Sequence, residues 1–357
     1  MKICIIGTVG VPACYGGFET LVDYIIESEV GEFTVYCSGK HYLNRLETYK
    51  KAKLVYIPVN ANGFMSVVYD VVSIIHALYS GHRNFLILGV SGAIIIPLMH
   101  LWPKLYTVTN IDGIEWRRNK WRGFSKWFLR FSESLAVKYS SVVVADNKSI
   151  AEYVDENYHR ECETIEYGGD HALIPIVDNA LLLSLDIDYS YSLSLCRIEP
   201  ENNVHLILEA FSRSNKNIIF IGNWDSSNYG RRLKVQFSNF NNIRLIGPIY
   251  ELATLSAYRT QCDTYIHGHS AGGTNPSLVE MMHFSKNIIA FDCSFNRATM
   301  ENNGIYFDST ESLIKIILDE DITAGAAQLF EVASRRYTWD IVTRKYLSLF
   351  YKEEDSA

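Results

Sequence analysis

The feature that most constrains the fold of this chain is a pattern of short apolar strands alternating with helical segments, which occurs twice along its 357 residues. Continuous runs rich in Val and Ile are typical of strands buried in a parallel sheet. The segments between them, such as 67–79 and 124–139, carry apolar residues at helical spacing. The predicted strands are 2–6, 33–37, 53–59, 85–90, 105–111 and 142–146 in the first block, and 192–198, 218–223, 243–247, 264–269 and 288–292 in the second. Two such blocks predict two Rossmann-like α/β domains with doubly wound sheets.

We expect the boundary between the two domains to follow the segment 164–170, where Gly168 and Gly169 could act as a hinge. The expected ranges are 1–172 for the first domain, 173–338 for the second and 339–357 for a C-terminal helix. Ligands of doubly wound sheets bind at the carboxyl ends of the strands. With two such sheets, the natural site is the cleft between them.

Composition limits the classes of protein to consider. The formal charge of −7 gives no reason to expect nucleic-acid binding. The seven cysteines are scattered without a C-x-x-C pair, which disfavours structural zinc and a disulfide framework and suits a reducing cytoplasm. No signal peptide is visible. The apolar stretch 85–102 is better explained by a buried strand followed by a buried helix than by a membrane span.

A glycine-rich loop follows the first predicted strand. The segment 7–20, GTVGVPACYGGFET, opens a helix, and Gly16 and Gly17 allow a ligand to approach the backbone closely. The glycine spacing fits neither the dinucleotide fingerprint nor the phosphate loop. The loop is either in contact with a donor phosphate or an acceptor, or a tight strand-to-helix turn.

A second special segment is 267–282, HGHSAGGTNPSLVEMM, in which a strand ends and a helix begins near Pro276. Either Thr274 or Asn275 is the expected N-cap. The free N–H groups at such a helix start predict a site for a diphosphate. Glu280, one turn into the helix, can accept hydrogen bonds from ribose hydroxyls, although it could equally be a solvent-facing side chain.

Three further polar positions lie at predicted strand ends. Arg197 ends the first strand of the second block, where a guanidinium can hold a leaving diphosphate, and the alternative is a surface arginine paired with a nearby glutamate. His269 lies at the same edge and is a candidate for donor contact. Asp112 follows the fifth strand of the first block, where it could bind a sugar hydroxyl or assist proton movement.

A basic, tryptophan-rich segment lies in the first block. Six basic residues and no acidic one occur between 117 and 130. Cations mixed with tryptophans suit an anionic membrane surface or an acceptor phosphate, and the alternative is a solvated helix face with buried tryptophans. The candidate membrane or acceptor patch comprises Trp116, Arg117, Arg118, Lys120, Trp121 and Arg122.

Several of these segments together resemble a known family. VPACYGGFET, IDGIEWRRNKW, RIEPENN, GNW followed by YGRRL, and YIHGHSAGGTNPSLVEMM occur in this order over most of the chain. They resemble glycosyltransferase family 4, and within it a bacterial rhamnosyltransferase-like group of capsule and O-antigen synthesis. The resemblance implies a GT-B fold, in which two Rossmann-like domains face a central cleft. It also implies retaining transfer without an obligatory metal or other cofactor.

The resemblance further implies the substrates and their place. The donor would be a dTDP- or UDP-linked sugar, with rhamnose as first choice, and the acceptor a saccharide on undecaprenyl diphosphate. The protein would be cytoplasmic and peripheral on the inner face of the membrane. The first domain would lie on the acceptor side, the second would bind the nucleotide sugar, and the helix at 339–357 would cross back to the first.

The resemblance gives roles to matching positions. Arg197 would contact the donor diphosphate, Gly273 and 274–277 would cradle phosphate or sugar, Glu280 would hold the ribose, and Gly16 with Gly17 would line the donor–acceptor junction. Together with positions inferred from the residues themselves, the candidate donor site is Gly16, Gly17, Arg197, His269, Gly273, Thr274, Asn275, Pro276, Ser277 and Glu280. The candidate catalytic residues are Asp112, Arg197 and Glu280, and no metal ligands are expected.

Two departures from the broader family keep other functions open. Gly272 stands eight positions before Glu280, where the family has a second glutamate, and Asn202 and Asn203 stand where it has a lysine. Arg231 or Arg232 could supply the missing cation. A nucleotide-sugar-modifying enzyme of the epimerase type, or a non-catalytic sugar-binding protein, remain the alternative functions.

Overall fold

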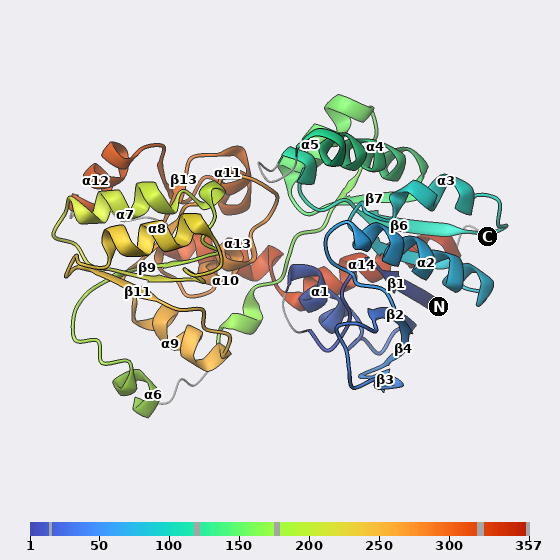
Figure 1. The fold of residues 1–357 in the computed structure, drawn as a ribbon, viewed down its shortest axis with the longest axis horizontal. Coiled ribbons are helices and arrows are strands. Elements are labelled where there is room, and N and C mark those ends of the chain that lie inside the picture. Colours follow the sequence, from blue (N-terminus) through green and yellow to red (C-terminus); the bar gives the residue numbers. More distant parts are fainter. Residues whose placement is uncertain (14–15, 118–121, 175–178, 320–324, 355–357) are drawn as a thin grey trace. The chain divides into compact units, whose positions relative to one another are not determined.

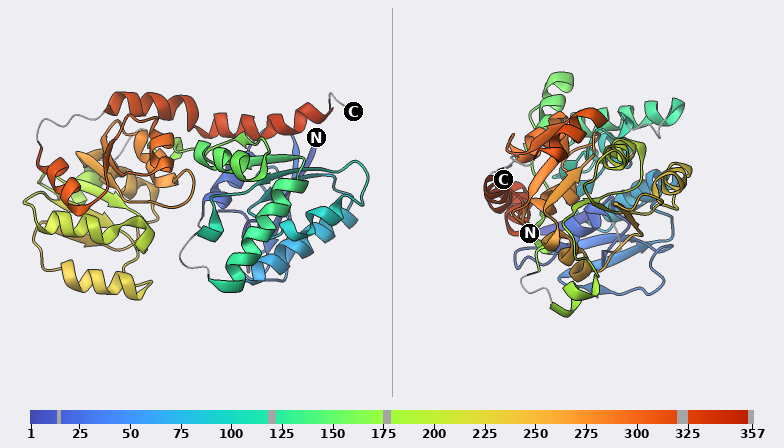
Figure 2. Two further views of the ribbon diagram at one scale, coloured as in Figure 1. Left: turned by 90° about the horizontal axis from the view of Figure 1, so that it is seen from above. Right: turned by 90° about the vertical axis from the view of Figure 1, so that its left-hand side faces the viewer.

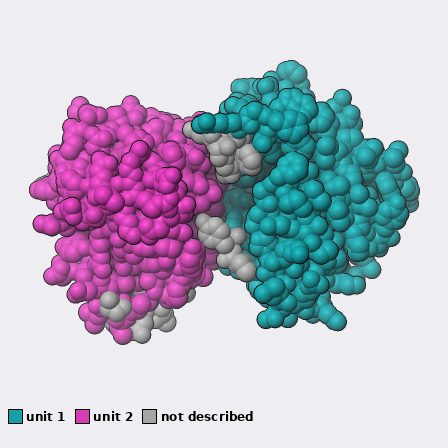
Figure 3. Space-filling model, viewed as in Figure 1, with its two compact units in different colours: residues 1–167, 339–357 teal, residues 168–338 magenta. Residues whose placement is uncertain are grey.

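The computed structural model of the chain describes residues 1–13, 16–117, 122–174, 179–319 and 325–354 (Figure 1). The chain divides into two compact units (Figure 3). Unit 1 contains Met1–Tyr167 and Trp339–Ala357, and unit 2 contains Gly168–Thr338. Each unit has its own sheet covered by helices, so the second half of the chain repeats the architecture of the first.

The sheet of unit 1 has eight strands in the described residues, in the order β3-β4-β2-β1-β5-β6-β7-β8. Its strands are β1 (Lys2–Ile6), β2 (Glu32–Ser38), β3 (Thr48–Tyr49), β4 (Ala52–Ile57), β5 (Asn84–Leu88), β6 (Tyr106–Asn110), β7 (Val142–Ala145) and β8 (Glu163–Thr164). All pairs are parallel except β3 with β4. β1 and β5 pair with Ile3 opposite Asn84. Because their connections leave in opposite directions along the sheet, a switch point lies between these two strands.

Helices cover both faces of the unit 1 sheet. They are α1 (Gly17–Ile25), α2 (Met65–Tyr79), η1 (Ala93–Ile95), α3 (Ile96–Met99), η2 (Glu115–Arg117), α4 (Gly123–Tyr139), α5 (Lys148–Tyr158) and α14 (Trp339–Glu354). Figure 2 shows α14 on one side of the sheet and α2 and α4 on the other. The core strands are continuous apolar runs because both faces are buried.

The last helix, α14, packs onto unit 1 through side chains from three elements. The Trp339 ring stacks on Tyr24 of α1 with centroids 4.5 Å apart. The buried amide of Asn110, at the end of β6, donates to the Tyr346 hydroxyl at 2.6 Å. Lys345 lies 3.1 Å from the buried carboxylate of Glu166. The chain therefore ends in the same unit in which it begins.

The sheet of unit 2 has six parallel strands in the described residues, in the order β11-β10-β9-β12-β13-β14. They are β9 (Ser192–Leu195), β10 (Ile218–Ile221), β11 (Ile243–Ile246), β12 (Thr264–His267), β13 (Asn287–Phe291) and β14 (Ile305–Phe307). β9 and β12 pair with Leu193 opposite Tyr265. A second switch point lies between these two strands.

The helices of unit 2 begin with local caps where the sequence offers them. They are η3 (Asp170–Ala172), α6 (Asn179–Ser184), η4 (Pro200–Asn202), α7 (Val204–Ser212), α8 (Asn228–Phe237), α9 (Leu252–Gln261), α10 (Pro276–Met282), α11 (Ser294–Met300), α12 (Thr310–Leu318) and α13 (Ala326–Arg336). Ser227 accepts from the Gly230 N–H at the start of α8, and Glu251 accepts from two N–H groups of α9. These caps satisfy amide groups that a helix leaves unpaired at its start.

One expected element differs from the structure. The strand within 85–102 is buried as predicted, but the helical part that follows leaves Ile94, Leu98 and Leu101 exposed. The prediction of a buried helix was wrong for this face, because η1 packs against α2 and α4, and α3 packs against α4, on one side only. In the described residues, no helix combines the length and apolar character that crossing a membrane requires.

Candidate functional site

Of the residues predicted to bind the donor, Arg197, His269 and those in 273–280 lie at the switch point of unit 2, whereas Gly16 and Gly17 belong to unit 1. Arg197 follows β9, and the segment 268–275 follows β12, which is the neighbouring strand. Parallel neighbours end at the same edge of a sheet, so the two loops lie side by side where the chain connections diverge. A ligand crevice is expected at this point in doubly wound sheets.

Asn202 ties the two loops of this edge together. Its amide nitrogen donates to the Arg197 carbonyl at 2.6 Å, and its amide oxygen lies 2.6 Å from Nδ1 of His269. Because the amide nitrogen is used by Arg197, the oxygen accepts the hydrogen of Nδ1, which fixes the ring of His269. Asn203 adds a second link by donating to the Gly268 carbonyl at 2.9 Å.

Gly268 lets the two loops approach this closely. A Cβ atom at Gly268 would lie 2.1 Å from the backbone oxygen of Asn202. No side chain fits at that distance, so the glycine is required by packing at the switch point. The Arg197 side chain itself is 47% exposed, and its Nη2 lies 3.8 Å from Glu199. It is therefore accessible to a ligand and held by only a loose ion pair.

Helix α10 begins at the same edge, with Asn275 as its N-cap. The Asn275 oxygen accepts from the Ser277 N–H at 3.1 Å and from the Ser277 hydroxyl at 2.7 Å. Of the two residues predicted to cap this helix, the structure selects Asn275, and Thr274 is buried beside it. Thr274 and Pro276 flank the cap, and Gly273 precedes Thr274. The segment 267–282, which the sequence predicted to be a site, is thus a turn that leads from β12 into a short helix.

Glu280 lies in α10 and is bound by two side chains from other elements. Arg259, on α9, forms an ion pair with its carboxylate and is itself only 2% exposed. His171, on η3, lies 3.5 Å from the other carboxylate oxygen. The Nη1 atom of Arg259 has no hydrogen-bond partner among the described residues. Glu280 is therefore neither solvent-facing nor free to move, and any ligand hydroxyl would meet a carboxylate already held in place.

The electrostatics of this cluster keep Glu280 ionised. Burial alone would raise the pKa of Glu280, but the charge of Arg259 and the hydrogen bonds from His171 and Arg259 outweigh it and lower the pKa. His267 shows the opposite case, because burial and its neighbour His269 lower its pKa well below the ordinary value. His267 is therefore neutral at physiological pH, and its Nε2 has no partner among the described residues.

In unit 1, the predicted loop after β1 is shaped by a buried carboxylate. Glu19 accepts a hydrogen bond from the Val9 N–H at 2.8 Å, and burial raises its pKa. A Cβ atom at Gly16, whose φ is +131°, would lie 2.0 Å from the same carboxylate. A Cβ atom at Gly17 would come within 3.1 Å of the Tyr167 ring. Packing thus accounts for both glycines.

Asp112 follows β6, as predicted, and has a positive φ of 60°. Its N–H donates to the side chain of Asn110 at 2.7 Å, which holds the turn. A non-glycine residue in this region of backbone space is strained, and such strain is often found at ligand sites. Burial raises the pKa of Tyr167, and the negative charge of Asp112 raises it further. The two side chains are therefore close enough to interact electrostatically.

The predicted basic patch is only partly described. Arg118, Lys120 and Trp121 lie outside the described residues. Trp116 donates to the Glu133 carboxylate at 3.3 Å, and the cations of Arg117, Lys126 and Arg130 lie between 5.2 and 5.6 Å from its ring. Arg122 is exposed at the N-cap of α4. Trp116 is therefore held by the protein itself and is not an exposed anchor.

Sequence reasoning missed several of these residues. Arg259 and His171 carried no motif, because their relation to Glu280 depends on helix packing. Asn202 was seen only as a departure from a family pattern, although it links the two loops. Arg231, considered as a substitute cation, donates to the Asp225 carbonyl and the Asn228 side chain at 2.5 Å each.

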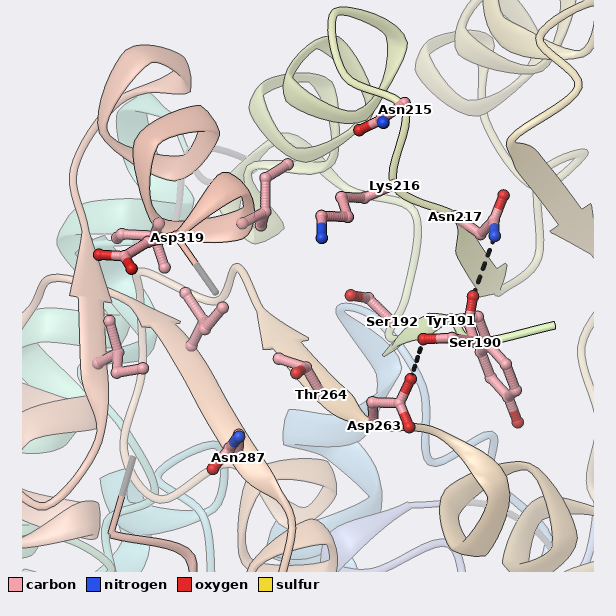
Figure 4. Close-up of a pocket in the computed structure, with 14 residues that line it drawn as sticks. Ser190, Tyr191, Ser192, Asn215, Lys216, Asn217, Asp263, Thr264, Asn287 and Asp319 are labelled. Atoms are coloured by element: carbon pink, nitrogen blue, oxygen red, sulfur yellow. Dashed lines mark hydrogen bonds between the residues drawn. The ribbon is translucent and has the colours of Figure 1, made fainter. Parts of the chain in front are cut away.

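A cavity of about 360 Å³ lies elsewhere in unit 2, at the amino ends of its strands (Figure 4). It is lined by polar residues that precede β9, β10 and β12, among them Ser190, Asn217 and Asp263. Asn217 donates to the Ser190 carbonyl at 3.0 Å, and the Ser190 hydroxyl donates to Asp263. This edge is opposite to the one that carries Arg197 and His269, so the cavity is not the predicted donor site.

Each half of the chain matches one family model. Residues 184–333 match the family model described as Glycosyl transferases group 1, and residues 1–170 match the one described as Domain of unknown function (DUF1972). No curated protein matches the chain in sequence.

Solved structures with the same fold cover almost the whole chain. Sucrose-phosphate synthase from Thermosynechococcus elongatus has a TM-score of 0.84 at 12% identity, with 100% of both chains covered. Anabaena HepE in complex with UDP-glucose has a TM-score of 0.74 at 16% identity, covering 99% of this chain and 100% of its own. The catalytic domain of starch synthase IV from Arabidopsis thaliana, bound to ADP and acarbose, has a TM-score of 0.73 at 12% identity, with 98% of both covered.

These findings define the fold of the chain and the class of domain in its second half. Its fold is the GT-B fold, with two Rossmann-like units whose sheets are dominated by parallel strands. Unit 2 carries a glycosyl transferases group 1 domain. The GT-B fold was predicted from the sequence and is confirmed for the whole chain, and the match of residues 184–333 supports the predicted glycosyltransferase class.

Proposed function

We propose that this protein is a retaining glycosyltransferase that moves a sugar, rhamnose as first choice, from a dTDP- or UDP-linked donor to a lipid-linked saccharide. The observation that carries the proposal is the accessible Arg197 beside the loop of His269 at the switch point of unit 2. The match of residues 184–333 to group 1 glycosyltransferases supports it. Solved structures with this fold also support it, because HepE binds UDP-glucose and starch synthase IV binds ADP.

In this proposal, unit 2 holds the donor. Arg197 binds the diphosphate in bidentate fashion, because its guanidinium is half exposed at the crevice. Backbone groups of Gly273 and 274–277 contact phosphate or sugar, and Glu280, held ionised by Arg259, accepts from ribose hydroxyls. His269 contacts the donor from the same edge. No metal or other cofactor takes part.

The transfer breaks the bond between the anomeric carbon and the diphosphate oxygen. Arg197 stabilises the negative charge that grows on the departing diphosphate. The acceptor hydroxyl forms the new bond on the same face of the sugar and releases its proton. Gly16, Gly17 and Asp112 belong to unit 1, to which we assign the acceptor. Asp112 binds a sugar hydroxyl or assists the departure of the proton.

The acceptor in this proposal is a saccharide on undecaprenyl diphosphate, made during capsule or O-antigen synthesis. In this proposal the enzyme works in the cytoplasm as a peripheral protein at the inner face of the membrane, where it meets its lipid-linked acceptor. The basic segment around Arg117 and Arg122 would then contact the membrane surface or the acceptor phosphate.

The proposal is tested by offering labelled dTDP-rhamnose and a panel of UDP-sugars together with native lipid extract. Label in the lipid fraction that depends on the protein and on one donor is the expected result. Conversion of the donor alone into a new nucleotide sugar would instead show an epimerase-type enzyme. Tight donor binding without any labelled lipid would show a sugar-binding protein, and either result would overturn the proposal.

A further inference from the structure

Unit 1 exposes an apolar stripe along the outer side of α2. Val68, Val72, Ile75 and Tyr79 follow helical spacing, and all are exposed, Tyr79 by 80%. The opposite side of the helix buries a second set of residues against the sheet. A surface helix normally carries polar residues on its outer face, so an outer stripe of this kind indicates an additional contact.

Two neighbouring segments continue this stripe. On η1 and α3 the exposed residues are Ile94, Leu98 and Leu101, the last by 78%. On α4 they are Phe124 and Trp127, which are 67% and 59% exposed, together with Phe131. The Trp127 and Phe131 rings are stacked with centroids 5.5 Å apart.

The three stripes belong to adjacent elements. α4 packs against η1 and α3, and η1 packs against α2, on the side of the sheet away from α14 (Figure 2). We name this surface the apolar face. It consists of Phe64, Met65, Val68, Val72, Ile75, Tyr79, Ile94, Leu98, Leu101, Phe124, Trp127 and Phe131.

The exposed charged residues on the helices of the apolar face are all basic. The acidic residues of α2, η1, α3 and α4 are Asp70 and Glu133, and both are buried. Asp70 accepts from Ser91, and Glu133 accepts from Tyr153 and Tyr158. The exposed cations Lys126 and Arg130 alternate with the aromatic residues of α4. In a chain with a net charge of −7, this is a local segregation of positive charge.

We propose that the apolar face docks on an anionic lipid surface. Aromatic and aliphatic side chains enter the boundary between headgroups and acyl chains, while Lys126 and Arg130 remain at the phosphate level. A symmetric contact with a second copy would bring like charges together, because the exposed charged residues of these helices are basic. The inference rests on the proposed function in one respect, because a lipid-linked acceptor gives the enzyme a reason to be at a bilayer.

The test is flotation of the full chain with vesicles, in the absence of donor and acceptor. Vesicles of phosphatidylethanolamine and phosphatidylglycerol are compared with vesicles of phosphatidylcholine alone. We expect binding to the anionic vesicles that weakens as salt rises from about 0.1 M to 1 M. The variants Phe124→Ser with Trp127→Ser, and Leu98→Ser with Leu101→Ser, should each lower the partition coefficient at least about tenfold.

A matched control replaces two exposed apolar residues of unit 2, Leu183→Ser with Val235→Ser, which should leave vesicle binding unchanged. Failure of the wild-type chain to float with anionic vesicles would overturn the inference. So would equal losses in the control, or a dimer that the same face variants dissociate while vesicle binding is absent. Donor binding, measured separately by calorimetry with UDP and dTDP, tests the proposed function without involving this face.

Discussion

Arg259 on α9 and Glu280 on α10 form an ion pair in which the guanidinium is almost completely buried. The carboxylate also faces His171 at 3.5 Å, so three elements of unit 2 converge on one side chain. The sequence presents Glu280 as a ligand-binding residue, and the structure adds a partner that holds it in its ionised form. Replacing either partner should therefore affect stability as well as function.

The first prediction concerns this ion pair. Glu280→Gln leaves a buried guanidinium without its counter-charge and should lower the free energy of unfolding by about 3–5 kcal/mol. Arg259→Met should lower the free energy of unfolding by a similar amount. The double variant should cost less than the sum of the two, and urea denaturation of all four proteins measures the coupling. Additive effects would contradict a direct interaction between the two side chains.

The second prediction concerns acid stability. The pKa of Glu280 is lowered in the folded protein from the ordinary value of 4.5. The unfolded chain therefore binds a proton more readily, and the stabilisation from the carboxylate is present above about pH 4.5 and lost as pH falls through the folded pKa. The stability difference between the wild type and Glu280→Gln should shrink on going from about pH 7 to pH 3. Denaturation curves at several pH values measure this difference in the free energy of unfolding. A difference that stays constant with pH would contradict an ionised Glu280 in the folded protein.

The third prediction concerns Arg197. Arg197→Ala should lower transfer roughly 100-fold, because the charge on the leaving diphosphate loses its counter-charge. It should change the free energy of unfolding by no more than about 0.5 kcal/mol, because the side chain is half exposed. Arg213→Ala is the matched control, since Arg213 is equally exposed and pairs with Glu209 and Glu311. Equal transfer activity in the Arg197→Ala and Arg213→Ala variants would show that Arg197 is not part of the donor site.

The fourth prediction concerns the close approach of the two loops. Gly268→Ala places a Cβ atom 2.1 Å from the Asn202 oxygen and should lower the free energy of unfolding by about 2–4 kcal/mol. Gly247→Ala is the control, because no atom of the described residues lies within 4 Å of its Cβ position. Thermal denaturation distinguishes the two. Similar stability in both variants would show that the loops shift easily.

The fifth prediction concerns the attachment of α14. Tyr346→Phe removes the oxygen that accepts from the buried amide of Asn110, and an unpaired buried donor costs about 1–3 kcal/mol. Tyr79→Phe, at an 80% exposed position, should have no measurable effect on stability. Urea denaturation compares the two variants. A stable Tyr346→Phe protein would indicate that this hydrogen bond does not help hold α14.

Much of the fold could be predicted from the sequence because its signals are local. The run KICII predicts a buried strand, and Thr274 or Asn275 before Pro276 predicts a helix cap, since each depends on residues only a few positions apart. The positions of Arg197 and Asp112 after strands also follow from local pattern. The predicted burial of the helix after residue 90 failed, because helical spacing does not say what covers each side.

The sequence by itself thus determined the strands, the helices and the turns that bring polar residues to strand ends. The tertiary structure decided that Arg259, 21 positions before Glu280, is its partner, and that Asn202 joins the loops after β9 and β12. It also left the outer sides of α2 and α4 uncovered. Secondary structure depends on neighbours along the chain, whereas ion pairing and exposure depend on which elements pack together, and that is set only when the sheets assemble.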